Sequence, residues 1–221
     1  MDDTVYRFHY RGSLKREYRA EELEGALGEC QAVLGGLMTE GKIMTAALYH
    51  YHQMLFFYYE CVGAEIKPEQ LLKALSPYLE LWPGQDGLRE WVYMYHIFYH
   101  AIPKGKQDWT RPTAPELRRG RIAFLKTDKL FSYVYHHQAI VDEGLWYGDK
   151  YQSIALHENI LFSYFEEPKT ITNIQGDLEK QSEAIKEWLK AVPEDHFIQM
   201  PEGKGENFMF LPAYFAWGQE E

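Results

Sequence analysis

The sequence predicts an α+β protein made of two βαββαβ halves in tandem. Two observations carry this prediction. Two aromatic hairpin segments, residues 42–60 and 150–166, align with each other, and the elements around each segment follow in the same order. Self-similarity of this kind is the signature of an internal repeat. We therefore expect one half at residues 1–100, a linker at 101–120 that contains three prolines, and the other half at 121–221.

The two hairpins carry matching residues along both strands. Residues 42–50 and 54–60 align with residues 150–158 and 160–166. Short aromatic and aliphatic runs around a polar turn are typical of β-hairpins. The identical pairs are Lys42/Lys150, Ala47/Ala155, Leu48/Leu156, Leu55/Leu161, Phe56/Phe162, Tyr58/Tyr164 and Glu60/Glu166.

The elements before the hairpins also repeat. The first half has a strand at residues 5–10 and a helix at about 19–38. The second half has a strand at residues 121–126 and a helix at about 129–146. Both halves therefore begin with a strand and a helix.

A second helix and a last strand follow each hairpin. In the first half the helix begins at Pro68, where a missing N–H is tolerated, and in the second half Asp177 is the expected N-cap. Aromatic strands at residues 91–99 and 208–217 end the two halves. This order is that of the split-βαβ or ferredoxin-like unit.

Both faces of the central strands are apolar, which indicates a second layer on each sheet. If Leu55 faces the helices, the alternation of side chains turns Tyr58 and Glu60 to the other face, and Tyr164 and Glu166 likewise. The natural second layer is the sister sheet. We therefore expect two antiparallel sheets packed as an intrachain dimeric α/β barrel, with an interior that takes a small-molecule ligand.

Composition excludes several classes of function. The net charge of −10 and the absence of a basic stripe beyond residues 117–121 argue against nucleic acid as a partner. Cys30 and Cys61 lack the spacing of a zinc site or of a disulfide framework, so we expect no metal and a reducing compartment. No segment is apolar enough for a membrane span or a leader peptide, and we expect a cytoplasmic protein.

One helical segment carries residues suited to proton transfer. Tyr133 and His137 stand at i and i+4, so they share a helix face. A histidine with its ordinary pKa near ~6.5 gives and takes protons at neutral pH. A histidine that is only hydrogen-bonded or solvated is the competing interpretation.

The run Tyr-x3-His-x2-Ile-x2-Glu at residues 133–143, the hairpin that ends in Glu166, and Trp188 resemble the L-rhamnose mutarotase family. That family is a small ferredoxin-like fold that interconverts sugar anomers. The resemblance covers about 70 residues of the second half, and it implies that His137 transfers protons, Tyr133 contacts the sugar and Trp188 stacks on it. Mutarotation needs a second proton-transferring group, for which Glu166 or Tyr164 is the candidate.

The sequence also departs from that family. Gln138-Ala139 and Val141-Asp142 replace its usual Asn-Pro and Trp-Pro, and Trp188-Leu189 replaces its paired tryptophans. The first half has no histidine at the matching place. Only the second half would therefore be catalytic, and the identity of the sugar does not transfer.

Three hypotheses remain. The first is a sugar mutarotase-like isomerase without a cofactor, with Tyr58 and Tyr164 as further ligand contacts. The second is a haem-binding or monooxygenase-type dimeric α/β barrel protein with His136 or His137 as axial ligand. The third is a non-enzymatic module that binds a small molecule or a protein partner. The sequence leaves open whether this single-chain pseudo-dimer associates further into a homodimer.

Overall fold

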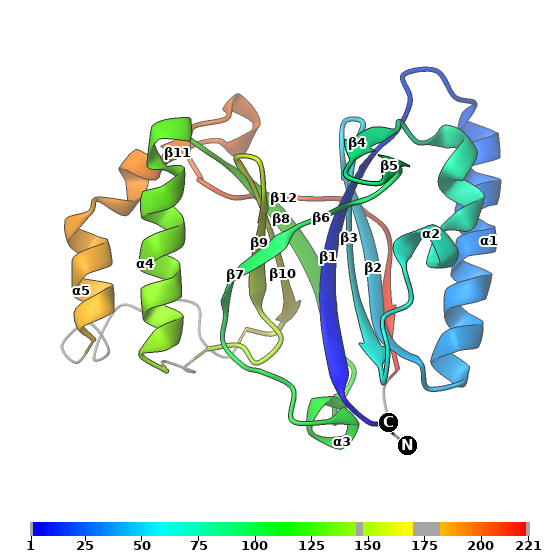
Figure 1. Ribbon diagram of the computed structural model, residues 1–221, viewed down its shortest axis with the longest axis horizontal. Helices are drawn as coiled ribbons and strands as arrows, with labels where there is room; N and C mark the ends of the chain where they lie inside the picture. Colours follow the sequence, from blue (N-terminus) through cyan, green and yellow to red (C-terminus); the bar gives the residue numbers. More distant parts are fainter. Residues whose placement is uncertain (1, 145–147, 170–181, 220–221) are drawn as a thin grey trace. The chain divides into compact units, whose positions relative to one another are not determined.

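The computed structural model describes residues 2–144, 148–169 and 182–219 (Figure 1). The chain forms two compact units. Unit 1 comprises Met1–Met94, Pro103–Ala114 and Pro212–Glu221, and unit 2 comprises Tyr95–Ile102 and Pro115–Leu211. Each unit contains an antiparallel sheet with helices packed against it. The predicted α+β class is therefore confirmed.

Unit 1 is built on a five-stranded sheet with the order β13-β2-β3-β1-β6, in which neighbouring strands are antiparallel. A small hairpin of β4 and β5 lies outside this sheet. The strands are β1 (Val5–Ser13), β2 (Ile43–Tyr51), β3 (Met54–Val62), β4 (Trp82–Gly84), β5 (Gly87–Arg89), β6 (Val92–Tyr93) and β13 (Ala213–Gly218).

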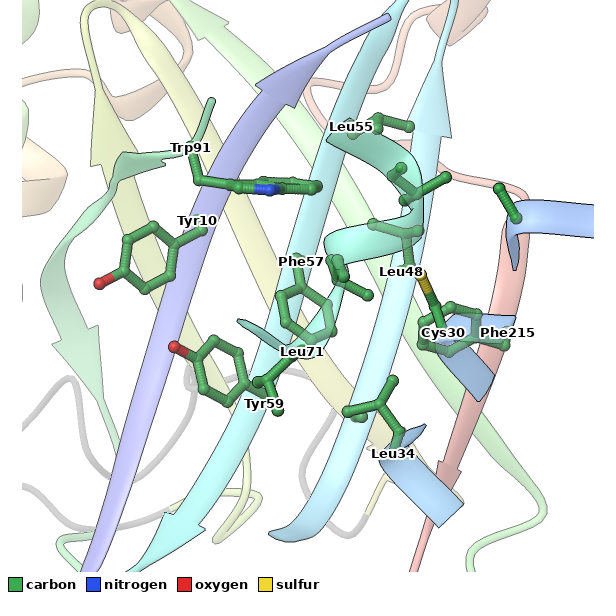
Figure 2. Close-up of a cluster of buried hydrophobic side chains, with 14 of the residues drawn as sticks. Tyr10, Cys30, Leu34, Leu48, Leu55, Phe57, Tyr59, Leu71, Trp91 and Phe215 are labelled. Carbon is green, nitrogen blue, oxygen red and sulfur yellow. The ribbon is translucent and has the colours of Figure 1, made fainter. Parts of the chain in front are cut away.

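Helix α1 (Ala20–Thr39) supplies most of the helical side of the unit 1 core. Its buried residues are Leu23, Ala26, Cys30, Leu34 and Met38, a spacing that places them on one helix face. Figure 2 shows Cys30 and Leu34 in the same cluster as side chains from the sheet, among them those of β3.

The predicted helix after the first hairpin is interrupted. Helix α2 (Pro68–Leu71) makes one turn, and a 3-10 segment follows at Lys73–Tyr78. Pro68 occupies the first turn as predicted, but Pro77 lies inside the following segment, where its ring and missing N–H prevent continuation as an α-helix. A further short helix, α3 (Lys106–Trp109), comes from the segment predicted as linker.

Unit 2 is built on a second antiparallel sheet, with the order β11-β8-β10-β9-β7 and β12 paired to β8. Its central strand β10 is buried along nearly its whole length. The strands are β7 (Tyr95–Tyr99), β8 (Leu117–Leu125), β9 (Ser153–His157), β10 (Ile160–Glu167), β11 (Phe197–Ile198) and β12 (Met209–Phe210).

Two helices, α4 (Leu130–Asp142) and α5 (Glu183–Lys190), pack against each other in unit 2, on one side of this sheet (Figure 1). Helix α5 begins at Ser182, whose hydroxyl accepts a hydrogen bond from the Ile185 N–H at 3.0 Å. The expected N-cap Asp177 and the expected helix end Trp146 lie outside the described residues.

The two long hairpins close with equivalent turns. Tyr51 pairs with Met54 and His157 pairs with Ile160, so each loop has two residues. The first loop residue has a positive φ in both, 52° at His52 and 55° at Glu158. Two-residue loops with positive φ match the twist of the strands that they join. Both predicted hairpins are therefore present.

The predicted last strands are each divided between the sheets. In the segment predicted as one strand at residues 91–99, β6 pairs with β1 and β7 pairs with β9. In the segment predicted at 208–217, β12 pairs with β8 and β13 pairs with β2. Sequence pattern fixes which residues are extended, but it does not select a partner strand far along the chain. The tandem duplication and the packing of the two sheets stay predictions. No helix in the described part of the chain is long and apolar enough to cross a membrane.

Candidate functional site

Helix α4 presents one buried face to the sheet of unit 2. Tyr133, His137 and Ile140 are 2%, 8% and 5% exposed, and they stand at helical spacing on one face. Phe131 and Tyr135, at the intervening positions, are 85% and 69% exposed. Tyr133 and His137 therefore point together into the unit.

Three aromatic rings surround the imidazole of His137. The Tyr133 ring stacks on it with centroids 3.9 Å apart and an interplanar angle of 19°. Trp188 of α5 and Phe98 of β7 meet it edge-on, at 4.9 Å and 5.4 Å. The predicted residues His137, Tyr133 and Trp188 are therefore in contact.

The hydrogen bond of His137 determines which of its two ring nitrogens carries the proton. Its Nδ1 lies 2.9 Å from the carbonyl oxygen of Tyr133, and a carbonyl only accepts, so Nδ1 carries the proton and the lone pair is on Nε2. Burial lowers the pKa of His137 to about 4. The imidazole is therefore neutral at pH 7. The sequence alone predicts a histidine of ordinary pKa, and the structure differs because the ring is buried.

A pocket of about 430 Å³ opens beside this cluster, entirely within unit 2. Its size falls in the range of ~300–1,000 Å³ that is usual for small-molecule sites. Aromatic rings form much of its wall, and polar groups converge on it at a few points. The aromatic members are Phe98, Tyr133, Trp188, Phe197 and Phe208, and the polar members include His100, Arg121, His137, Gln152, Lys169 and Glu194.

Two cationic side chains line the pocket. The guanidinium carbon of Arg121 lies 5.1 Å from the ring centroid of Phe165 and 4.5 Å from that of Phe208. The Lys169 Nζ lies 3.8 Å from the Phe165 centroid. Burial, together with the nearby Arg121 charge, lowers the pKa of Lys169 to about 8.

Gly148 and His100 form a close contact at the pocket wall. A Cβ added to Gly148 would lie 2.4 Å from the His100 Cε1 and Nδ1 atoms, which is shorter than any real contact. The φ of Gly148 is +156°, which side chains rarely adopt. Only glycine therefore fits here without a shift of the ring.

The other predicted site residues of unit 2 do not line this pocket. The Tyr164 hydroxyl donates to Glu166 Oε1 at 2.7 Å, and Arg118 Nε lies 3.8 Å from the same oxygen. Neither Tyr164 nor Glu166 is among the residues of the pocket wall. The expected second proton-transferring group is therefore not beside His137.

Tyr58 belongs to a separate polar cluster in unit 1. Its hydroxyl donates to Glu60 Oε1 at 2.6 Å, Trp109 Nε1 donates to the same oxygen at 2.9 Å, and Arg111 Nη1 donates to Oε2 at 2.6 Å. Burial alone would raise the pKa of Glu60, but the Arg111 charge and these hydrogen bonds lower it to about 2. Glu60 is therefore a satisfied structural carboxylate.

Sequence reasoning missed Arg121, Lys169 and Arg111. A signal existed for Arg121, because it shares the strand parity of Ala123 and Leu125, which are core residues. A charge at such a position indicates a partner or a ligand. Arg111 lies in the segment predicted as a linker, and the local sequence pattern there does not indicate a buried ion pair.

No protein-family model matches the chain, and no curated protein matches it.

Several solved structures are similar to the chain over nearly their whole length. A candidate monooxygenase from Lactobacillus acidophilus has 7% identity and a TM-score of 0.46, covering 98% of this chain and 97% of its own. A candidate chlorite dismutase has 8% identity and a TM-score of 0.39, covering 95% of each chain. A haem-binding protein from Thermus thermophilus has 12% identity and a TM-score of 0.39, covering 96% and 94%. Similarity this remote carries no activity over to this chain.

The expected relation to the L-rhamnose mutarotases is wrong. The comparison finds structures of monooxygenase, chlorite dismutase and haem-binding type instead. The site geometry gives a physical reason, since Glu166 and Tyr164 lie outside the pocket of His137 and its imidazole is not protonated at neutral pH. The predictions of isomerase activity and of a sugar ligand rested on that relation and are wrong with it.

Proposed function

We propose that unit 2 binds a planar, conjugated small molecule in the pocket beside His137. The observation that carries this proposal is the aromatic wall around a neutral, fixed imidazole. Trp188 and Phe98 both meet the His137 ring edge-on, so ring faces and edges are already arranged around this point. Flat ligands gain most from such walls because stacked and edge-on ring pairs contribute about 0.5–1.5 kcal/mol each beyond burial.

Haem is the first candidate within this class. Iron-ligating histidines present a neutral nitrogen and donate their other ring N–H to a fixed acceptor. His137 has this arrangement, with Nδ1 bonded to the Tyr133 carbonyl and, among the described residues, no hydrogen bond to Nε2. His137 would hold the iron and the aromatic wall would pack against the macrocycle. A bound haem would supply redox chemistry that no amino-acid side chain provides.

A titration with two readouts tests this proposal. Haem is added to the purified chain while its Soret band and the fluorescence of Trp188 are followed. We expect a shifted Soret band and quenching. His137→Gln should abolish the shift, whereas His136→Gln should keep it, because His136 is not part of the pocket wall. Trp188→Phe should reduce the quenching more than Trp217→Phe in unit 1 does, since the other tryptophans of the six in the chain still emit.

The two readouts separate the claims. Quenching without a Soret shift would exclude iron ligation by His137 and leave a planar ligand without a metal. An unchanged spectrum and unchanged fluorescence with haem and with 2-naphthamide would overturn the proposal as a whole.

We also infer that the units arose by tandem duplication of a ferredoxin-like element. Both hairpins have two-residue turns with a positive φ at the first position. Both carry a tyrosine that donates to a glutamate two residues on, Tyr58 to Glu60 at 2.6 Å and Tyr164 to Glu166 at 2.7 Å. Packing of the two sheets as a dimeric α/β barrel belongs to this proposal. A crystal structure that places both sheets tests it.

A cytoplasmic location is part of the same proposal. Cys30 and Cys61 are both buried free thiols. Burial raises the pKa of each thiol, which keeps it protonated and unreactive. Fractionation of cells that express the tagged chain, with thiol alkylation after denaturation, tests both the compartment and the reduced state.

A further inference from the structure

Arg121 is a cation without a carboxylate partner among the described residues. No ion pair of its guanidinium is present there, and its Nε is buried without a hydrogen-bond partner. Its guanidinium carbon lies 5.1 Å from the ring centroid of Phe165 and 4.5 Å from that of Phe208. Arg121 as a whole is half-buried, and withdrawing a cation even partly from water is unfavourable unless an anion or several acceptors compensate it.

Lys169 brings a second positive charge to the same pocket. Its Nζ lies above Phe165 and 3.4 Å from Gln152 Oε1, a long contact to a neutral acceptor. The nearest carboxylate in sequence, Glu167, is engaged by Arg119, with Nε and Oε1 3.2 Å apart. Burial, and after it the repulsion from Arg121, lowers the pKa of Lys169, while the carboxylates of Asp149 and Glu167 act in the opposite direction.

The charges of the pocket wall indicate how much negative charge a ligand brings. Arg121 and Lys169 are positive, Glu194 is negative and His137 is neutral. Summed over these side chains of the wall alone, without the neighbouring Asp149, the charges leave one net positive charge. A single carboxylate balances it, whereas a phosphate carries about −1.5 to −2 charges at pH 7.

We propose that Arg121 and Lys169 form an anion subsite of this pocket and that the ligand is an aromatic carboxylate. The carboxylate would lie against the donors of Arg121, and the ring would lie beside Trp188 and His137. A guanidinium can make the planar, two-point contact that suits a carboxylate, and the ring contacts of Arg121 with Phe165 and Phe208 hold it at the pocket wall. This inference rests on the proposed function, because it names the chemical class of the ligand for the same pocket.

Matched probes test the charge directly. Binding of 2-naphthoate, 2-naphthamide and 2-naphthyl phosphate to the whole chain is measured by calorimetry at pH 7. These probes share one ring system and differ in the charged group. We expect 2-naphthoate to bind about tenfold more tightly than 2-naphthamide, because hydrogen bonds between charged partners are stronger than those to a neutral amide. The phosphate should bind more weakly than the carboxylate.

Substitutions of Arg121 and Lys169 test whether these two cations cause the preference for 2-naphthoate over 2-naphthamide. Arg121→Gln and Lys169→Gln should each remove most of the preference for 2-naphthoate over 2-naphthamide, measured as the ratio of the two affinities in the same variant. Lys126→Gln is the control, since Lys126 directly follows the same strand, is exposed and lies outside the pocket wall. Arg121→Lys keeps the charge and should retain part of the preference. Lys169, at the end of the described segment, is the second variant if Arg121→Gln does not fold.

The outcomes distinguish the two proposals. Equal affinities for 2-naphthoate and 2-naphthamide would overturn the anion subsite while the pocket stands as a planar-ligand site. Tighter binding of the phosphate would overturn the carboxylate class. If none of the three probes and no haem binds, the proposed function fails and the subsite fails with it. A preference that survives both Arg121→Gln and Lys169→Gln would contradict the assignment to these residues.

Discussion

The imidazole of His137 stacks on the phenol ring of Tyr133 with centroids 3.9 Å apart, and its Nδ1 also hydrogen-bonds the carbonyl oxygen of that tyrosine. One residue therefore fixes both the plane and the tautomer of the histidine. Together with burial, this contact leaves a neutral imidazole with its Nε2 lone pair available.

Protonation of His137 should make the ligand-free protein less stable in acid. The folded-state pKa is about 4 and the unfolded value is about 6.5, so between these values the unfolded chain binds the proton and the folded chain does not. The stabilisation is complete above pH 6.5 and is lost as the pH falls to 4, amounting to roughly 3 kcal/mol. Urea denaturation at several pH values should show a smaller loss for His137→Gln. Parallel profiles for the two proteins would contradict the assignment.

Removal of Arg111 should unfold unit 1 more easily. Arg111 donates to both carboxylate oxygens of Glu60, at 2.6 Å and 2.9 Å, and both side chains are buried. Arg111→Gln leaves an uncompensated carboxylate, which destabilises by about 3–5 kcal/mol. In denaturation experiments the double variant Arg111→Met, Glu60→Gln should lose less stability than Arg111→Gln. If the double variant lost more stability than Arg111→Gln, the loss in Arg111→Gln would not come from leaving the Glu60 carboxylate without its partner.

Gly148→Ala should disturb the pocket wall. The added methyl would overlap the His100 ring and would adopt a φ of +156°, so we expect a loss of about 1–3 kcal/mol together with weaker ligand binding. Gly205→Ala is the control, because Gly205 has a φ of +91° and its added methyl would have no neighbour within 4 Å. Comparing the two by thermal denaturation separates backbone strain from overlap. Equal losses would mean that the His100 contact contributes nothing.

Arg121→Met should leave the ligand-free protein as stable as the wild type, or up to about 1 kcal/mol more stable. The desolvation penalty of an uncompensated ion is several kcal/mol, and two ring contacts of about 0.5–2 kcal/mol each offset only part of it. The same substitution should weaken binding of 2-naphthoate. Urea denaturation with and without the probe measures both effects. A loss of more than 2 kcal/mol without the probe would identify Arg121 as a structural residue.

Local pattern was sufficient for the hairpins and for the buried face of α4. The alternation in residues 54–60 and the polar turn residues act between neighbours, as does the helical spacing of Tyr133 and His137. Each of these features is settled within about ten residues of the chain.

The pairing of strands that are far apart in the sequence could not be predicted from local pattern. The pairing of β7 with β9, and of β13 with β2, depends on which edge a strand reaches, and the pattern of a short aromatic strand suits either sheet. The pocket also depends on pairing between strands that are far apart in the sequence. Arg121 and Lys169 are 48 positions apart, and only the pairing of β8 with β10 brings them to one ring, Phe165.

The most direct test of the central claim is the fluorescence titration of Trp188 with a planar ligand. The pocket places Trp188 and His137 with their ring centroids 4.9 Å apart. Haem or 2-naphthoate should quench the wild type and Trp217→Phe at a shared midpoint, while Trp188→Phe, which keeps the other five tryptophans, should be quenched to a smaller extent. Unchanged wild-type fluorescence over the full titration, or equal quenching in Trp188→Phe, would contradict a planar-ligand site in unit 2.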